Sequence, residues 1–292
     1  MTAGAPRPLN PVEHCTQMVR ERDYASYIAG RAIASADTRN AFYVLRAFAV
    51  ELASVPEMVS NATLGKMRYQ FWRDALRPDA RPPQHPLAQA LHPLIGNPVP
   101  AYHLKRIVDA RDADLGRTSY PDTGALTTHC ESTTSTLLYA QVSLLPNLPP
   151  SALDTASHVA SHVGVAAGLA TLLRALPFHA AQRRLVLPVD LTAKHGVTHE
   201  DVFRHGGDAQ GVSDAVFALA TVANDHLLTA RDMLTDGIPD QVAPIIAAPG
   251  VPAALYLERL EKENFNAFAP SLQARDWKLA WRMWRALRSL KI

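Results

Sequence analysis

Hydrophobic residues recur every three or four positions along most of the chain. In the segment 39–55, Phe42, Leu45, Phe48 and Leu52 share one face of a helix at this spacing, and Asp37 precedes them as the expected N-cap. The same periodicity predicts further helices at 11–33, 60–76, 101–115, 124–145, 162–174, 190–195, 198–203, 212–234, 251–263 and 271–290. The chain is therefore expected to be almost entirely helical.

The breaks in this pattern indicate one domain. No strand-like alternation and no internal repeat is found. The Pro-rich stretch 77–100 is expected to be a surface loop carrying one short helix at 87–94, because neither flank could close a core alone. We expect a short flexible N-terminus at 1–11, followed by a single all-α domain at 12–292.

The segment 162–190 combines a smooth helix with an abrupt end. Gly164 and Gly168 lie four positions apart among small residues, so another helix backbone could approach closely. Pro177 cannot donate a helical hydrogen bond and clashes with the preceding turn, so the helix should bend or end there.

Composition and charge exclude several classes of protein. A hydrophobic content of 48% excludes a disordered chain, and a formal net charge of +2 gives no electrostatic reason to expect nucleic-acid binding. Cys15 and Cys130 lie in helical patterns far apart, which favours reduced thiols over a disulfide. The most apolar run, 156–173, contains two histidines and is not a clean membrane span, and the N-terminal residues resemble neither a signal peptide nor a transit peptide.

Two groups of polar residues could bind metal. His158 and His162 lie four positions apart on one helix face, but no acidic residue accompanies them, so packing or hydrogen-bonded histidines are favoured over a zinc site. Asp109, Asp112 and Asp114 could form an acidic metal site, although a solvated helix end explains them more simply. No nucleophile motif for Ser/His/Asp or Cys/His catalysis is found.

The last predicted helix carries Trp277, Trp281 and Trp284 at the spacing i, i+4, i+7. Four cations are expected on its other faces: Lys278, Arg282, Arg285 and Arg288. Indoles that pack on the core are the simpler interpretation. A surface that docks on a partner or on an anionic membrane is the alternative.

Three segments resemble the squalene/phytoene synthase family. Residues 68–76 (RYQFWRDAL) are similar to its R-x-x-W-W-R-x-E-L helix, and residues 107–115 (IVDARDADL) to its I-D-G-M-x-x-D-L helix. Residues 183–201 (RRLVLPVDLTAKHGVTHED) resemble its R-I-Y-L-P-x-D-x-L-x-x-x-G-V-x-x-E-D segment. The resemblance implies an isoprenoid-synthase-like helical bundle around a central cavity.

Condensing members of this family hold Mg²⁺ with two Asp-rich motifs, which neutralise the diphosphate leaving group. The first motif corresponds here to residues 53–57, with Ala53, Ser54 and Pro56 before Glu57, its only acidic residue. The second corresponds to residues 175–179, where none is acidic: Ala175, Leu176, Pro177, Phe178 and His179. Prolines within both motifs should also disturb the helix geometry that aims the ligands.

The resemblance therefore implies a pseudoenzyme without catalytic residues, metal or cofactor. Two alternatives stay open. One is a divergent prenyl transferase that uses substitute ligands, namely Glu51, Glu57, Asp109 and Asp112. The other is an isoprenoid- or lipid-binding protein that keeps only the cavity.

One branch of the family shares the acid-free form of the second motif. The phytoene-synthase-like assembly factors of mitochondrial respiratory complex I resemble this chain at 22–24, 45–53, 67–72, 131–139 and 173–179. This resemblance implies a non-catalytic assembly factor on the matrix side of the mitochondrial inner membrane, in peripheral contact with it. Its implied partners are complex I subunits or other assembly factors.

Overall fold

The computed structural model describes residues 10–79, 81–235, 237–274, 276–289 and 292. Within these ranges the chain is helical and carries no strand, apart from one isolated bridge between Ile95 and Val99. The predicted all-α class is confirmed. Most of the segment 1–11 lies outside the described residues, and its predicted flexibility stays a prediction.

The first part of the chain forms six helices: α1 (Pro11–Arg22), α2 (Tyr24–Gly30), α3 (Ala36–Met58), α4 (Ala62–Ala75), α5 (Pro86–Leu91) and α6 (Ala101–Asp114). A single helix at 11–33 was the wrong prediction, because Asp23 ends α1 with φ −138° and its side chain caps α2 by accepting from the Ser26 amide at 3.3 Å. Asp37 is not the N-cap of α3. Ser35 takes that place, and Asp37 lies in the first turn, where a carboxylate still interacts well with the helix dipole.

A π-helical turn interrupts the helix predicted at 124–145. The segment divides into α7 (Thr123–Cys130), the π-helix η2 (Glu131–Ser135) and α8 (Thr136–Val142). Thr136 Oγ1 donates to the carbonyl of Glu131 at 2.8 Å, which satisfies an acceptor within the widened turn.

The widened turn packs on the two glycines of α9 (Pro150–Arg174). A Cβ on Gly164 would lie 2.4 Å from Ser135 Cα, and one on Gly168 would lie 2.7 Å from Cys130 Sγ. The predicted close approach of another helix backbone is confirmed, and η2 and α7 provide it. Side chains larger than hydrogen have no room at these two contacts.

Pro177 acts as predicted, and two other prolines do not end the helix in which they lie. Helix α9 ends at Arg174, and Pro177 lies in the first turn of the short helix α10 (Leu176–Ala181). Helix α14 (Ala243–Lys262) begins before the predicted position 251 and runs through Pro249 and Pro252, both of which lie inside it. Burial along nearly the whole of its first half stabilises α14 beyond what local propensity predicts.

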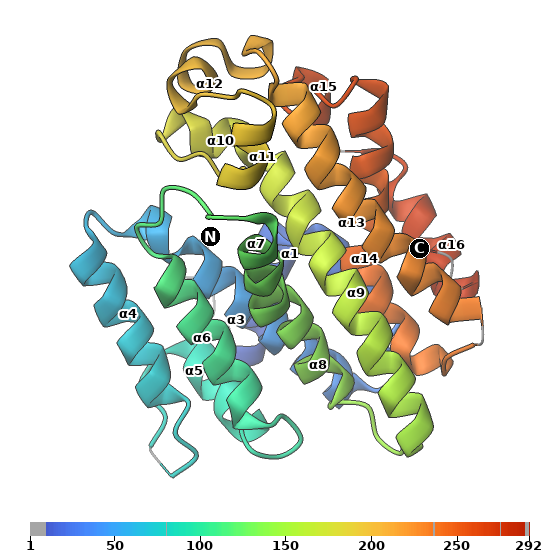
Figure 1. Ribbon diagram of the computed structural model, residues 1–292. Coiled ribbons are helices and arrows are strands. Elements are labelled where there is room, and N and C mark those ends of the chain that lie inside the picture. Colours follow the sequence, from blue (N-terminus) through green and yellow to red (C-terminus); the bar gives the residue numbers. More distant parts are fainter. Residues whose placement is uncertain (1–9, 80, 236, 275, 290–291) are drawn as a thin grey trace, which may run out of the picture.

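The remaining elements complete the bundle: η1 (His92–Leu94), α11 (Val189–Lys194), α12 (His199–His205), η3 (Gly206–Asp208), α13 (Val212–Thr235), η4 (Asp240–Val242), α15 (Pro270–Gln273) and α16 (Leu279–Ser289). Helix α9 runs through the middle beside α13 and α14, with α4 and α6 on one side and α16 on the other (Figure 1). The short helices α10, α11 and α12 form a cap at one end (Figure 1).

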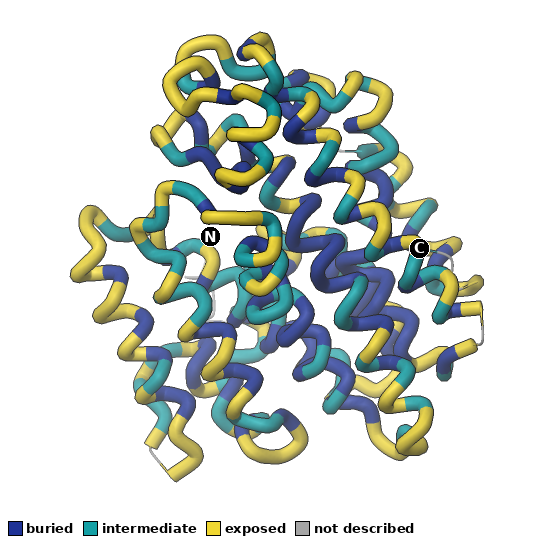
Figure 2. Tube along the Cα trace, viewed as in Figure 1, coloured by how far each residue is buried: buried dark blue, intermediate teal, exposed yellow. Residues whose placement is uncertain are grey.

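Helix α9 is the centre of the core (Figure 2). In the described part of the chain it is the one helix long and apolar enough to cross a membrane, but 67% of its most apolar window is buried among the other helices. Cys15 and Cys130 are buried free thiols, as predicted, and burial raises the pKa of each to about 12. Neither thiol is therefore ionised near neutral pH.

Candidate functional site

The positions assigned to the first Asp-rich motif lie in the last two turns of α3. Ala53 and Glu57 are exposed there. Ser54 is half-buried, donates its hydroxyl to the carbonyl of Val50 at 2.8 Å and accepts from Arg22 at 3.1 Å. A serine hydroxyl that bonds the backbone of its own helix and also binds a guanidinium offers little to a cation.

Pro56 does not disturb α3 as the sequence predicted. The helix continues through it to Met58. Proline cannot donate to the carbonyl four residues earlier, that of Leu52, and the buried Tyr69 hydroxyl of α4 donates to this oxygen instead, at 3.2 Å. The expectation was wrong because a tertiary hydrogen bond replaces the missing helical one.

The positions assigned to the second motif lie where α9 gives way to α10. Ala175 is the C-cap of α9, Leu176 is buried and Phe178 is 46% exposed. Burial and the neighbouring Arg184 lower the pKa of His179. A neutral imidazole beside a guanidinium replaces the negative charge that a magnesium site would need.

The carboxylate whose charge acts on His179 is Asp114, and it is already engaged. Its Oδ1 accepts from the Tyr120 hydroxyl at 2.6 Å and lies 3.3 Å from Arg117 Nε, while its Oδ2 lies 3.7 Å from Arg184 Nη2. Arg184 also donates to the carbonyl of Arg117 at 2.9 Å. We call Asp114, Arg117, Tyr120 and Arg184 the Asp114 cluster. It joins α6 to the loop before α11 and carries more cations than carboxylates.

A second histidine beside this cluster is held neutral. Burial, and then the charge of Arg111, lower the pKa of His129 to about 4. Its ring lies 5.6 Å from that of Tyr120. Sequence reasoning missed this cluster, because Arg184 is far from Asp114 along the chain and only Arg117 and Tyr120 lie close enough to have signalled it.

Three of the four proposed substitute ligands, Glu51, Asp109 and Asp112, are paired with arginines. Glu51 lies 3.3 Å from Arg68. Arg73 of α4 bridges Asp109 at 2.7 Å and Asp112 at 2.6 Å on α6. The described residues contain no group of three His, Cys, Asp or Glu side chains that could hold a metal ion. These carboxylates hold helices together and do not converge on one point.

His162 is hydrogen-bonded, as the sequence favoured. Its Nδ1 lies 2.9 Å from Nδ1 of His226 on α13, so one ring donates and the other accepts. Burial lowers the pKa of both rings, which keeps them neutral and suits this contact. The pair of half-buried rings links α9 to α13.

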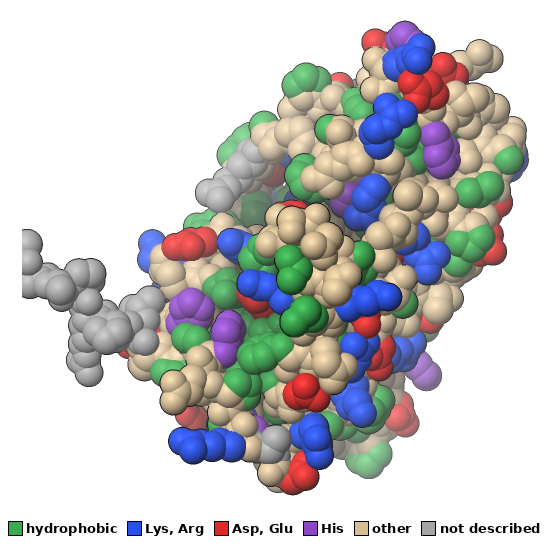
Figure 3. Space-filling model, turned by 90° about the vertical axis from the view of Figure 1, so that its left-hand side faces the viewer, with side chains coloured by type: hydrophobic (Ala, Val, Ile, Leu, Met, Phe, Trp, Pro, Cys, Tyr) green, Lys and Arg blue, Asp and Glu red, His purple; other side chains and the backbone are tan. Residues whose placement is uncertain are grey.

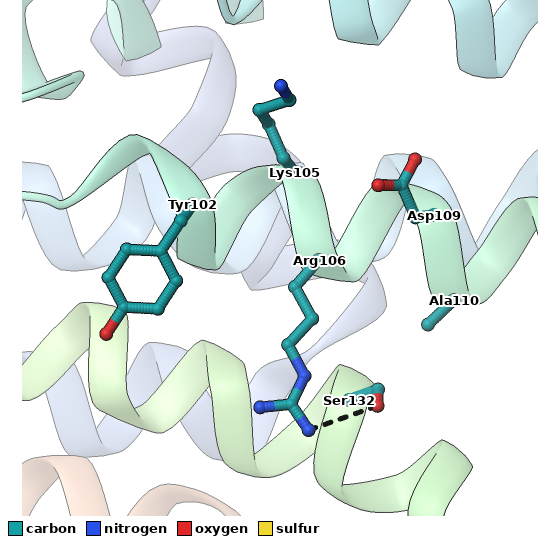
Figure 4. Close-up of a pocket in the computed structure, with 6 residues that line it drawn as sticks. All are labelled: Tyr102, Lys105, Arg106, Asp109, Ala110 and Ser132. Atoms are coloured by element: carbon teal, nitrogen blue, oxygen red, sulfur yellow. Dashed lines mark hydrogen bonds between the residues drawn. The ribbon is translucent and has the colours of Figure 1, made fainter.

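Two pockets lie apart from the assigned motif positions. One is a shallow hollow of about 430 Å³, lined by residues of α6 and by Ser132. Figure 4 shows the Arg106 side chain pointing to Ser132, to which it donates at 3.3 Å. The other, of about 350 Å³, lies among residues 16–43. Lys, Arg, Asp and Glu side chains are interspersed over the face that includes α4 and α6 (Figure 3), so this face has no charge of a single sign.

The C-terminal tryptophans face the solvent. Trp277 precedes α16 and is 83% exposed, while Trp281 and Trp284 are 54% and 52% exposed. Packing of the indoles on the core was the wrong prediction, because Met283 and Ala286 fill that place. The prediction that the cations lie on other faces holds for Arg282, which pairs with Glu258 of α14, but not for Arg285 and Arg288. The guanidinium carbons of Arg285 and Arg288 lie 5.8 Å and 4.5 Å from the ring centroids of Trp281 and Trp284.

The chain is similar to one protein family and, over most of its length, to a group of named proteins. The family model described as squalene/phytoene synthase matches residues 19–285. The chain is 36% identical over 279 residues to the rat protein "NADH dehydrogenase (ubiquinone) complex I, assembly factor 6", covering 94% of this chain and 81% of that protein. Its human counterpart of the same name is 33% identical over 281 residues, again covering 94% and 81%.

A solved structure shows the same fold. The crystal structure of a dehydrosqualene synthase in complex with ligand superposes with a TM-score of 0.80 at 15% identity, covering 96% of each chain. At this identity the similarity establishes the isoprenoid-synthase-like helical architecture alone.

Proposed function

The chain belongs to the squalene/phytoene synthase family, and we propose that within this family it is a non-catalytic assembly factor for respiratory complex I. The observation that carries the proposal is its 33–36% identity, over 94% of its length, to rat and human proteins named as complex I assembly factors. The dehydrosqualene synthase shares the fold at only 15% identity. Sequence similarity thus favours the assembly factors over the enzymes.

The charges at the assigned motif positions support the absence of synthase chemistry. Ionising an allylic diphosphate requires Mg²⁺ ions held by converging carboxylates. The first assigned segment contributes Glu57 alone, and the second contributes His179 beside Arg184. Of the remaining candidates, Asp109 and Asp112 share Arg73 as their ion-pair partner, and Glu51 pairs with Arg68. A pseudoenzyme explains these features better than a divergent prenyl transferase does.

The proposed setting follows from the same relatives. We infer a mitochondrial protein on the matrix side of the inner membrane, in peripheral contact with it. Its partners are complex I subunits or other assembly factors. Helix α9 is the core of the bundle, so the contact with the membrane is assigned to the surface of the protein.

The assembly role is tested by deleting the gene and resolving respiratory complexes on native gels. We expect complex I to be lost while the other respiratory complexes remain, and complementation with wild-type protein to restore it. The variant Glu57→Gln should restore complex I equally well, because Glu57 is exposed and serves no chemistry in this proposal. An unchanged complex I profile after deletion would overturn the proposal.

The enzymatic alternative is tested on purified protein. Incubation with farnesyl diphosphate and Mg²⁺ should release no diphosphate above the level of a no-protein control. Steady turnover that Glu57→Gln or Asp112→Asn abolishes would establish a prenyl transferase instead. Native mass spectrometry of the same preparation separates the remaining alternative, since a lipid-binding protein would retain a bound lipid.

A further inference from the structure

We propose that one face at the C-terminal end of the chain binds the surface of an anionic phospholipid bilayer. The face consists of Trp277, Lys278, Trp281, Trp284, Arg285 and Arg288, and we call it the indole–cation face. The proposal deepens the peripheral membrane contact put forward above and rests on it for its biological setting.

The arrangement of α16 separates this face from the core. At 3.6 residues per turn, Trp281, Trp284, Arg285 and Arg288 fall within an arc of about 100°. Met283, on the opposite side of the helix, is fully buried. Figure 1 shows α16 at the outer edge of the molecule, beside α14. The indole–cation face therefore points away from the rest of the protein.

Exposure of so many indoles is unusual for this chain. It contains four tryptophans, and three of them lie on this face with at least half of their surface in solvent. The fourth, Trp72, is 2% exposed. Scattered exposed apolar side chains are ordinary, but a cluster of large ones marks an interaction site.

Each exposed indole lies beside a cation. The cation-to-centroid distances are 5.5 Å for Lys278 and Trp277, 5.8 Å for Arg285 and Trp281, and 4.5 Å for Arg288 and Trp284. Tryptophan prefers the headgroup region of a bilayer, and Lys and Arg bind its anionic phosphates. The alternation of these two residue types fits a lipid surface along the whole length of α16.

The acidic groups near this face are already engaged. Arg282 pairs with Glu258 of α14 through two contacts of 3.0 Å and 2.7 Å, which holds α16 against the core. Asp276 accepts from the Lys278 amide at 2.8 Å and lies 4.0 Å from Arg259. In the described ranges, no ion pair is recorded for the side chains of Lys278, Arg285 or Arg288. Their charges are thus available to lipid phosphates.

A bilayer fits this face better than a protein partner does. Protein interfaces built on tryptophan and arginine usually insert these side chains into complementary pockets, or receive a partner in one. Neither of the two pockets described above is lined by residues of α16. All the large aromatic side chains here are tryptophan, the residue characteristic of membrane interfaces.

The test uses the purified full-length protein and vesicles of two compositions, phosphatidylcholine alone and equal parts phosphatidylcholine and phosphatidylglycerol. We expect sedimentation with the anionic vesicles only. Each cation near an anionic surface strengthens binding about fivefold, so Arg285→Gln with Arg288→Gln should weaken it roughly 25-fold. A matched control, Lys105→Gln with Arg106→Gln on α6, removes the same charge elsewhere and should leave binding within about twofold.

Fluorescence distinguishes insertion of the indoles from simple charge attraction. Because Trp72 is buried, quenching by brominated lipid in anionic vesicles reports on the exposed tryptophans. We expect strong quenching, and loss of sedimentation in Trp281→Ser with Trp284→Ser while circular dichroism stays unchanged. Absence of binding to anionic vesicles, unquenched emission, or equal weakening by the α6 control would each overturn the proposal. Such a result leaves the assembly role to be judged on native gels.

Discussion

The hydrogen bond from Tyr69 to Leu52 should be worth more to stability than its length suggests. Tyr69 and Leu52 are both fully buried, and the carbonyl of Leu52 lacks its helical donor because residue 56 is proline. Tyr69→Phe removes the donor with little change of shape. A buried acceptor left unsatisfied costs about 1–3 kcal/mol, so the free energy of unfolding should fall by roughly 2 kcal/mol.

The loss of stability in Tyr69→Phe is measured by urea denaturation, followed by circular dichroism, in a double-mutant cycle with Pro56→Ala. Pro56→Ala restores an amide that can donate to Leu52, so Tyr69→Phe should cost less than about 0.5 kcal/mol in that background. Tyr256→Phe is the matched control. Tyr256 is 6% exposed and its hydroxyl has no hydrogen-bond partner among the described residues, so its loss should be nearly neutral.

Two results would refute this account of α3. In the first, Tyr69→Phe is no more destabilising than Tyr256→Phe. In the second, Tyr69→Phe costs the same with proline or alanine at position 56, which would mean that the hydroxyl does not act through Leu52.

Three further measurements test other contacts. Gly164→Ala should lower the free energy of unfolding, measured in urea titrations, by about 2 kcal/mol. The new Cβ would press on the backbone of η2, and this overpacking, about 3 kcal/mol, is offset by about 1 kcal/mol from the higher helix propensity of alanine. The pKa of His129 is lowered from 6.5 to about 4, so its contribution to stability is fully present above pH 6.5. The free energy of unfolding should fall by up to about 1.4 kcal/mol per pH unit as the pH drops from 6.5 toward 4. His129→Gln should flatten that slope in urea titrations at several pH values. Arg73→Met should lower the thermal midpoint measured by calorimetry, since Asp109 and Asp112 then repel each other without their shared partner.

The local pattern predicted the helical class well, because periodicity reports directly on which residues are buried. It failed where tertiary contacts override local propensity. Pro249 and Pro252 lie inside α14, whose first half is almost wholly buried. The π-helical turn η2 also has no periodic signature of its own. Its widened backbone packs directly on Gly164 of α9, and this contact joins residues far apart in sequence.

The candidate site was also only partly predictable, because residue types are visible in the sequence and tertiary contacts are not. Residue type alone shows that the positions assigned to the second motif lack carboxylates, and no structure was needed for that. What the sequence could not show is which side chains pair with the carboxylates of α6. Whether Asp114 is free for a cation or bound to Arg184 depends on two segments that meet only in the folded chain.

The ion pairs also give a physical reason why a synthase fold could lose its metal chemistry and persist. Clustered carboxylates repel one another unless a cation neutralises them, so an active synthase carries a site that is costly when empty. A protein without synthase chemistry, as proposed here, does not need such a cluster and so avoids this repulsion. Asp109 and Asp112 share Arg73, and Asp114 lies beside Arg117 and Arg184. His179, whose pKa is lowered by burial, needs no counter-ion. The interior then serves packing, and recognition falls to the outer surface, where Trp281 and Trp284 of α16 stay exposed.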